Sequence, residues 1–426
     1  MNITFLCLGS RGDVQPYIAL GQGLQRSGHH VRIATHQIFQ PLVTHYGLEF
    51  RLVEGNPQEL LQGDAAKQVL KSGGNIIKMA RKFREAGSPI LRQMLDSSLT
   101  ALQGSDALIY GILGFSAYHL AQLWNIPAIA MPLQPITRTT RYQATGFPSL
   151  PYLPGYNRLS WLIAEEIFIH MIADPVSKWR DSTLPLPPLS SRAQYQQMLQ
   201  LRHPIIYGIS PTVLPRPKDY PPFHRLAGYW FLEEAGGWQP PAGLQAFLTQ
   251  GPKPVYIGFG SMDAGESQQT TASVLAALKN TGQRAVLLRG WGGIHAEDLP
   301  STAYLIDSVP HSWLFPQMAA IVHHGGAGTT AAAFRAGVPQ LLLPHFADQP
   351  LWAQRVSALK AGPPPLYMNN LTPQKLTAAL LQTTTNPAYQ QNARALGQLI
   401  RQEDGVTTAV SWINTILADH YGKQHT

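Results

Sequence analysis

At 426 residues the chain is long for one domain, and two α/β domains are the natural expectation. Charged residues make up only 13% and hydrophobic residues 44%, which argues against a disordered chain and for extensive buried surface. The net charge of +8 suits an anionic ligand or an anionic membrane surface. Because the basic residues are scattered and no nucleic-acid-binding signature occurs, we predict no nucleic-acid partner.

The sequence also indicates a compartment. Its single cysteine, Cys7, forms no intrachain disulfide and is predicted to fill a core, which fits the cytoplasm. No apolar run of about 18 residues predicts a membrane span, and the first residues lack the features of a signal peptide. We expect a cytoplasmic protein that contacts the membrane at most peripherally. No Cys/His cluster has zinc-site spacing, so we predict no metal.

A β-α-β unit opens the chain. A strand over 3–8 is followed by a glycine loop over 9–16, a helix to about Arg26 and a second strand over 31–35. The loop lacks the Gly-Lys-Ser/Thr of a P-loop and the dinucleotide spacing, so it has another role. It offers one acid, Asp13, at the edge where α/β sheets bind ligands; the residues alone support a helix N-cap equally well.

The rest of the first half is less regular. A basic amphipathic segment over 76–84 fits either a membrane-surface helix or an ordinary solvated helix. A long Pro- and Tyr-rich stretch over 132–154 is typical of a binding loop. Aromatic residues in and around these segments predict an apolar ligand pocket, although core packing explains some of them equally well. The predicted pocket residues are Trp124, Tyr142, Phe147, Trp161 and Phe168.

Four prolines within 215–222 predict the domain linker, which we place at 215–224. The predicted domains are 1–214 and 225–405. A second strand-helix alternation follows the linker, with strands over 254–258, 285–289 and 340–343. The pattern thus predicts two Rossmann-like halves.

The most informative stretch lies in the second half. An apolar strand over 319–322 leads into His323-His324-Gly325-Gly326-Ala327-Gly328-Thr329-Thr330 and then an Ala-rich helix. A strand, a glycine turn and a helix start direct backbone N–H groups and the positive helix end at one place, which favours phosphate. His324 adds a donor that can carry charge. An ordinary strand-helix turn with a Thr cap is the alternative.

Three segments together resemble the family 1 nucleotide-sugar glycosyltransferases of GT-B fold, especially the branch of the sterol 3β-glucosyltransferases and bacterial antibiotic glycosyltransferases. They are 9–16, 228–231, and 309–316 continuing through 323–330 to 348–349. The resemblance covers nearly the whole chain. It implies an α/β, GT-B fold of two doubly wound domains facing across a cleft. It also implies an N-terminal acceptor domain, a C-terminal donor domain and a last helix, about 406–422, that returns to the N-terminal domain.

The resemblance also implies roles for individual residues. Asp13 matches the general base position. The diphosphate would be bound by Ser261, His324, Gly326, Gly328 and Thr329, the base and ribose by Val309 and His311, and the sugar by Asp348 and Gln349.

Two positions depart from the plant members of the family. Those members have a His where Asp13 stands and an Asp, at the position of Gly111, that orients it. Asp13 would therefore act alone. They also have a ribose-binding Glu where this chain has Ala332, so ribose recognition must come from elsewhere.

We predict that the protein transfers a hexose, with inversion, to a hydroxyl of an apolar acceptor such as a sterol or other isoprenoid. The favoured hexose is glucose, donated by UDP-glucose. The UDP-sugar is a co-substrate and no cofactor is expected. One alternative is a glycosyltransferase that acts on a polyketide, phenolic or carotenoid acceptor. Two others of the same fold are a nucleotide-sugar epimerase and a non-catalytic protein that binds a nucleotide sugar or a lipid.

Overall fold

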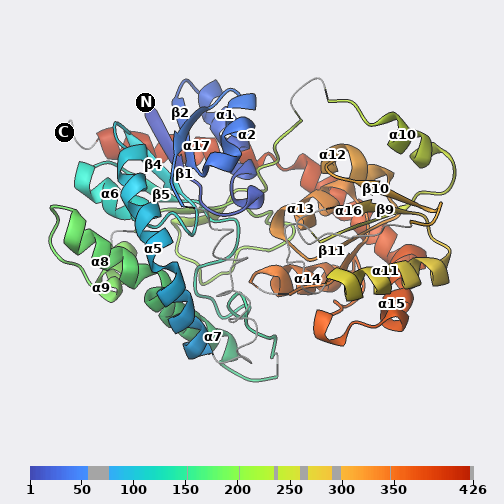
Figure 1. Ribbon diagram of the computed structural model, residues 1–426. Helices are drawn as coiled ribbons and strands as arrows, with labels where there is room; N and C mark the ends of the chain where they lie inside the picture. Colours follow the sequence, from blue (N-terminus) through green and yellow to red (C-terminus); the bar gives the residue numbers. More distant parts are fainter. Residues whose placement is uncertain are drawn as a thin grey trace. The chain divides into compact units, whose positions relative to one another are not determined.

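The computed structural model describes residues 1–55, 76–150, 152–200, 202–234, 238–259, 267–289, 299–345 and 347–422. Side chains are not described for 76–88, 171–172, 194–195, 199–200, 267–269 and 369. The chain divides into two compact units (Figure 1). Unit 1 contains Met1–Pro211, Arg216–Leu232 and Asp404–Thr426, and unit 2 contains Thr212–Pro215 and Glu233–Glu403.

Unit 1 is built on a parallel sheet of order β3-β2-β1-β4-β5-β6-β7. Its strands are β1 (Asn2–Leu6), β2 (His30–Thr35), β3 (Glu49–Leu52), β4 (Ala107–Tyr110), β5 (Ala128–Ala130), β6 (Ile205–Tyr207) and β7 (His224–Leu226). Its helices are η1 (Arg11–Asp13), α1 (Gln15–Arg26), η2 (Gln37–Phe39), α2 (Gln40–His45), α5 (Ile76–Ala101), α6 (Ser116–Trp124), α7 (Tyr156–Phe168), η3 (Ile169–Ala173), α8 (Asp174–Thr183), α9 (Ser191–Gln200) and α17 (Gly405–Gly422).

Unit 2 repeats the plan with the parallel order β10-β9-β8-β11-β12. Its strands are β8 (Val255–Gly258), β9 (Ala285–Leu288), β10 (Ala303–Ile306), β11 (Ala320–His323) and β12 (Gln340–Leu342). Its helices are α10 (Ala242–Thr249), α11 (Ser267–Thr281), α12 (His311–Leu314), η5 (Phe315–Gln317), α13 (Ala327–Ala336), α14 (Gln349–Ala358), η6 (Met368–Asn370), α15 (Pro373–Thr385) and α16 (Pro387–Gln402).

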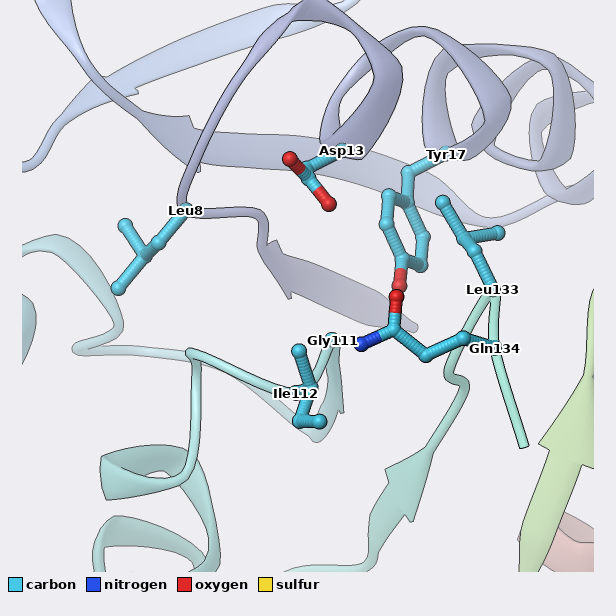
Figure 2. Close-up of a pocket in the computed structure, with 7 residues that line it drawn as sticks. All are labelled: Leu8, Asp13, Tyr17, Gly111, Ile112, Leu133 and Gln134. Carbon is cyan, nitrogen blue, oxygen red and sulfur yellow. The ribbon is translucent and has the colours of Figure 1, made fainter. Parts of the chain in front are cut away.

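Both strand orders create a switch point at which ligands of doubly wound sheets bind, outside the carboxyl ends of the strands. In unit 1, β1 lies between β2 and β4, and the loops after β1 and β4 carry Asp13 and Gly111 (Figure 2). In unit 2, β8 lies beside β11, and the loop after β11 carries His324. The topology therefore places the predicted acid and the predicted phosphate loop at the ligand-binding edge of their own sheets.

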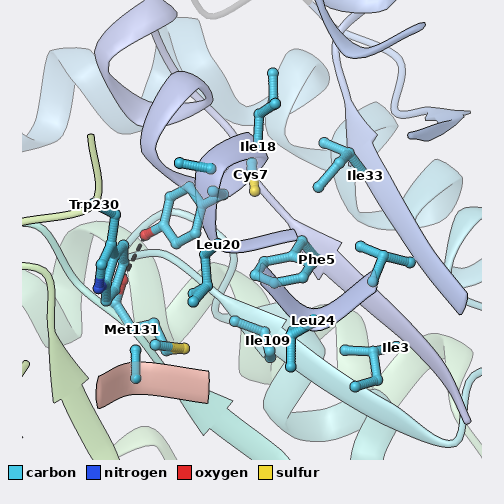
Figure 3. Packing of buried hydrophobic residues seen from close by; sticks show 14 of the residues in the cluster. Ile3, Phe5, Cys7, Ile18, Leu20, Leu24, Ile33, Ile109, Met131 and Trp230 are labelled. Carbon is cyan, nitrogen blue, oxygen red and sulfur yellow. Dashed lines mark hydrogen bonds between the residues drawn. The ribbon is translucent and has the colours of Figure 1, made fainter. Parts of the chain in front are cut away.

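The core of unit 1 forms between β1 and α1 (Figure 3). Alternate residues of β1, Ile3 and Phe5, are fully buried against Ile18 and Leu24 of α1. Cys7 is fully buried in the same cluster. Near-continuous apolar strands of this kind are typical of a parallel sheet covered on both faces.

Most of the segment predicted to be the linker, 215–224, falls in unit 1. Strand β7 begins at the last residue of this segment and pairs with β6, with Ile205 opposite His224. The Arg216 side chain holds the proline-rich turn by donating to the carbonyl oxygens of His224, at 3.0 Å, and Tyr220, at 2.8 Å. Prolines here fix a turn that leads into an edge strand, a position at which missing N–H donors are tolerated.

Helix α17 belongs to unit 1 and packs on α1. His29 Nε2 lies 2.8 Å from Asn414 Oδ1, and the Arg225 guanidinium lies 5.2 Å from the ring centroid of Trp412. A Cβ at Gly23 would lie 2.6 Å from Val406 Cγ1, so α1 and α17 approach closely at this glycine. Within the described ranges, no helix combines the length and hydropathy that crossing a bilayer requires.

Candidate functional site

In unit 1, Asp13 lies in a small pocket at the carboxyl edge of the sheet (Figure 2). The pocket has a volume of about 10 Å³, room for roughly one water-sized group. It is lined by Leu8, Asp13, Tyr17, Gly111, Ile112, Leu133 and Gln134. Among the described residues that line it, Asp13 is the only acid and none is a histidine. A single carboxylate therefore faces a space that fits a hydroxyl group.

The Asp13 carboxylate is held by local hydrogen bonds. Its Oδ2 atom accepts from the Ser10 backbone N–H at 2.8 Å and from the Ser10 hydroxyl at 2.9 Å. Burial raises the pKa of Asp13 above its ordinary value of 3.8, while the two bonds from Ser10 lower it by less. The raised pKa makes this carboxylate a stronger base than an exposed one. Asp13 ends η1, and Val14 is the N-cap of α1, so the N-cap alternative for Asp13 is wrong.

Two glycines leave room for this arrangement. Gly9 has φ +130°, and a Cβ on it would lie 2.5 Å from Asp13 Oδ2. A Cβ on Gly111 would lie 2.8 Å from the Tyr17 hydroxyl oxygen, which donates to the Met131 carbonyl at 2.6 Å. Gly111 therefore lies in the Asp13 pocket, but it supplies no side chain to orient the acid.

In unit 2, the glycine loop joins β11 to α13 as predicted. Gly326 is the N-cap of α13, and the Thr330 N–H and hydroxyl both donate to the Gly326 carbonyl, at 3.0 and 2.9 Å. The backbone N–H groups of residues 327–329 precede that first helical bond. Gly328 is exposed and Thr329 half-buried, so this end of the helix is accessible to an anion.

His324 lies against the loop. A Cβ at Gly326 would lie 2.5 Å from His324 Nε2, so the imidazole packs directly on this glycine. The Nδ1 atom of His324 is buried and has no hydrogen-bond partner among the residues that the structure describes. Burial, reinforced by His323 and His345, lowers the pKa of His324 to about 3. Desolvation therefore favours the neutral ring of His324.

The predicted sugar-binding pair follows β12 at the start of α14. Gln349 is buried, and its Oε1 accepts from the His345 N–H at 2.8 Å, while Asp348 Oδ2 accepts from Trp352 Nε1 at 2.6 Å. A Cβ on Gly325 would lie 3.2 Å from the Gln349 carbonyl oxygen, so α14 begins beside the glycine loop. The structure thus brings Gln349 and the predicted phosphate loop together.

The other predicted donor residues vary in their surroundings. The Val309 side chain is buried in the core, whereas His311 is half-buried and stacks on Phe315, with ring centroids 4.2 Å apart. Ala332, at the predicted ribose position, is half-buried on α13. Ser261 lies outside the described residues.

None of the five predicted acceptor residues lines the pocket at Asp13. Trp161 is 4% exposed and donates to the Tyr142 carbonyl at 2.9 Å, so this pair stabilises the loop after β5. Phe168 packs edge-on against Phe115, with centroids 5.5 Å apart. Trp124 ends α6, and Phe147 is half-buried. Core packing therefore accounts for Trp161, the alternative considered from sequence.

The segment 76–84 is helical as the first part of α5, but its side chains lie outside the described part of the chain. Within the described residues, no group of three or more His, Cys, Asp or Glu side chains is arranged to hold a metal ion.

Sequence reasoning missed several neighbours of these groups. Ser10, Gln340 and His345 are polar residues that contact or surround Asp13, His323 and His324. Ser10 could have been found from its position three residues before Asp13, which is the spacing of a capping box. Gln340 lies on another strand, 17 residues from His323, and no local pattern connects the two.

Comparisons with known proteins agree with this geometry. Residues 3–92 match the family model of the glycosyltransferase family 28 N-terminal domain, and residues 288–404 match that of the erythromycin biosynthesis protein CIII-like C-terminal domain. The chain is 37% identical to a sterol 3-beta-glucosyltransferase of Cryptococcus neoformans var. neoformans, in a match that covers 97% of this chain. The same match covers 27% of the fungal protein, so the chain spans about a quarter of that relative's length.

Solved structures share the fold. The glycotransferase of kitacinnamycin has a TM-score of 0.69 and 19% identity, with 98% of this chain and 99% of that chain covered. The glycosyltransferase VinC in complex with DTDP has a TM-score of 0.63 and 18% identity, with 98% and 100% covered. Both are GT-B enzymes in which two parallel-sheet α/β domains form the chain, as units 1 and 2 do here.

Proposed function

Because the chain belongs to the glycosyltransferases of GT-B fold, we propose that it moves a hexose from a nucleoside diphosphate sugar to a hydroxyl of an apolar acceptor. The acceptor class we favour is a sterol or related isoprenoid, because the curated relatives with about 37% identity are named for that reaction. The donor we favour is UDP-glucose. The observation that carries the proposal is the accessible start of α13, with His324 packed beside it, at the ligand-binding edge of unit 2.

The chemistry of the donor half is leaving-group stabilisation. The N–H groups of 327–329 and the positive end of α13 would bind the diphosphate as its charge develops. A neutral His324 would donate one N–H to the same phosphate, and a bound anion would in turn favour the protonated ring. Losing one such preorganised donor typically lowers kcat by about 10²–10³. Asp348 and Gln349 would bind sugar hydroxyls.

The chemistry of the acceptor half is proton removal. Asp13 would take the proton of the acceptor hydroxyl as that oxygen attacks the anomeric carbon, the bond to the diphosphate breaks, and the configuration inverts. Burial supports this role because it raises the pKa of Asp13 and so strengthens the base. A positioned general base typically contributes about 10²–10⁴ in rate.

No cofactor is part of the proposal, since the UDP-sugar is a co-substrate and N–H donors would stabilise the leaving group. Turnover in excess EDTA should equal turnover without it. We also propose peripheral contact with a membrane surface, because sterols reside in lipid. Flotation with phosphatidylglycerol-containing vesicles tests this contact, and a protein that stays with the soluble fraction would contradict it.

One assay tests the function. The purified chain is incubated with UDP-glucose and a panel of a sterol, a polyketide, a phenol and a carotenoid alcohol, and products are identified by mass. A glucosylated sterol as the preferred product supports the proposal. Preference for another acceptor supports the second candidate, a transferase of antibiotic or phenolic acceptors, which the fold shared with antibiotic glycosyltransferases favours. Nucleotide binding without transfer or hydrolysis would indicate a non-catalytic binder.

A further inference from the structure

A buried polar pair lies beneath the glycine loop of unit 2. His323 ends β11 and Gln340 begins β12, and both side chains are 0% exposed. His323 Nε2 lies 3.0 Å from Gln340 Oε1, and the backbone N–H of Gly325 donates to His323 Nδ1 at 3.1 Å. The imidazole thus links the neighbouring strand to the first glycine of the loop.

These contacts define one protonation state of the ring. Nδ1 must carry a lone pair in order to accept from Gly325, so the single proton lies on Nε2 and points at Gln340 Oε1. Burial lowers the pKa of His323 to about 4, which keeps the ring neutral near pH 7. A doubly protonated ring would place an N–H against the Gly325 N–H and break the link.

Gly325 has a left-handed backbone, with φ +95°, and it directs the chain from β11 into the start of α13. A hydrogen bond that anchors its N–H therefore acts on the residue that turns the loop. Residues 327–329, whose backbone N–H groups are expected to bind phosphate, follow shortly after it. The pair does more than fill the core, because the His323 ring accepts a hydrogen bond from the main chain at this turn.

We propose that His323 and Gln340 are positioning residues that hold the loop amides and His324 in the geometry that binds a diphosphate. The inference rests on the proposed function, since it assigns to the pair the preorganisation of the donor site. Neither side chain needs to touch the substrate for this role.

The first variants change the Gln340 side chain, whose Oε1 atom is the hydrogen-bond acceptor for His323. Gln340→Leu removes Oε1, leaves the His323 ring without its partner, and should weaken UDP binding about tenfold, equivalent to ~1.4 kcal/mol. Gln340→Glu keeps the shape but places a carboxylate beside Nε2, which favours the doubly protonated ring. As pH falls from 8 to 6, its UDP affinity relative to wild type should therefore decrease by about tenfold.

Other titrating groups face this site and are shared by all variants. They are His324 beside the pair, His345 near His324, and His311 of α12. The phosphate of UDP also titrates near this range. Taking the ratio of variant to wild-type dissociation constants at each pH removes these contributions. Gln283→Glu is the matched control, because Gln283 precedes β9, which β8 and β11 separate from β12, and its side chain donates to Thr384 Oγ1.

A thermal melt first shows that each variant is folded. Calorimetry then measures the dissociation constants of UDP and TDP. Weaker binding by Gln340→Leu and a pH-dependent loss in Gln340→Glu, with Gln283→Glu unchanged, supports the positioning role. If Gln340→Leu does not fold, the pH dependence of UDP binding by Gln340→Glu tests the positioning role by itself. Wild-type affinity in the Gln340 variants at every pH overturns the role but leaves the proposed function intact. A wild-type chain that binds neither nucleotide overturns the proposed function first, and the positioning role with it.

Discussion

The contact between Gly326 and His324 gives a sharp test of the donor site. Gly326 has φ −58° and ψ 141°, an ordinary conformation, so alanine at this position introduces no backbone strain. The new Cβ would nevertheless lie 2.5 Å from His324 Nε2, whereas ordinary contacts begin at 3.4 Å. Gly326→Ala should therefore displace the imidazole by about 0.9 Å.

A displacement of about 1 Å of a group that acts in the transition state can lower the rate about 10²-fold. We expect Gly326→Ala to reduce kcat for UDP-glucose and a sterol acceptor by about that factor. The assay is the initial rate at saturating substrates, with UDP binding measured by calorimetry in parallel.

The His324→Ala background separates the ring from the loop. If Gly326→Ala acts through the imidazole, adding it to His324→Ala should change kcat by less than about twofold, since no ring is left to displace. The reasoning is refuted if Gly326→Ala retains wild-type kcat. It is also refuted if the two substitutions reduce kcat additively, because the loop itself would then be the affected part.

Three further predictions concern unit 1. Because the pKa of Asp13 is raised above 3.8 and the base must be ionised, kcat/KM should fall as pH decreases through that raised pKa. Ser10→Ala removes a hydrogen bond that lowers the pKa of Asp13, so the acid limb of the pH profile should move to higher pH. A limb at lower pH would contradict this. Gly9→Ala places a Cβ 2.5 Å from Asp13 Oδ2 and should reduce kcat about 10²-fold with unchanged UDP affinity; equal losses in both would contradict a local effect. Gly23→Ala should lower the free energy of unfolding by about 1–3 kcal/mol in urea through the clash with Val406, so a higher midpoint would contradict the packing of α17 on α1.

Regular patterns made the outline of the fold predictable. The strand, loop and helix around Asp13 and those around the glycine loop follow from apolar runs bounded by glycine, and the structure has β1, α1, β11 and α13 at these places. Parallel order follows from the same alternation, because such units form doubly wound sheets. The two candidate loops could thus be assigned to the carboxyl edges of their sheets from sequence.

Long-range contacts could not be predicted in this way. The proline-rich segment 215–224 resembles a linker locally, and only the pairing of β7 with β6 shows that it belongs to unit 1. Trp161 has the sequence environment of a pocket residue, but its buried hydrogen bond to Tyr142 depends on a loop 19 residues away. The charge state of His324 depends on burial by neighbours that are distant in sequence.

Asp13→Asn tests the central claim most directly, because the amide has nearly the same shape and can still accept from Ser10, yet it cannot take a proton. Turnover of UDP-glucose with a sterol acceptor should fall by about 10²–10⁴, while calorimetry should give wild-type affinity for UDP. Turnover close to that of the wild type, in a variant that binds UDP normally, would contradict the assignment of Asp13 as the base.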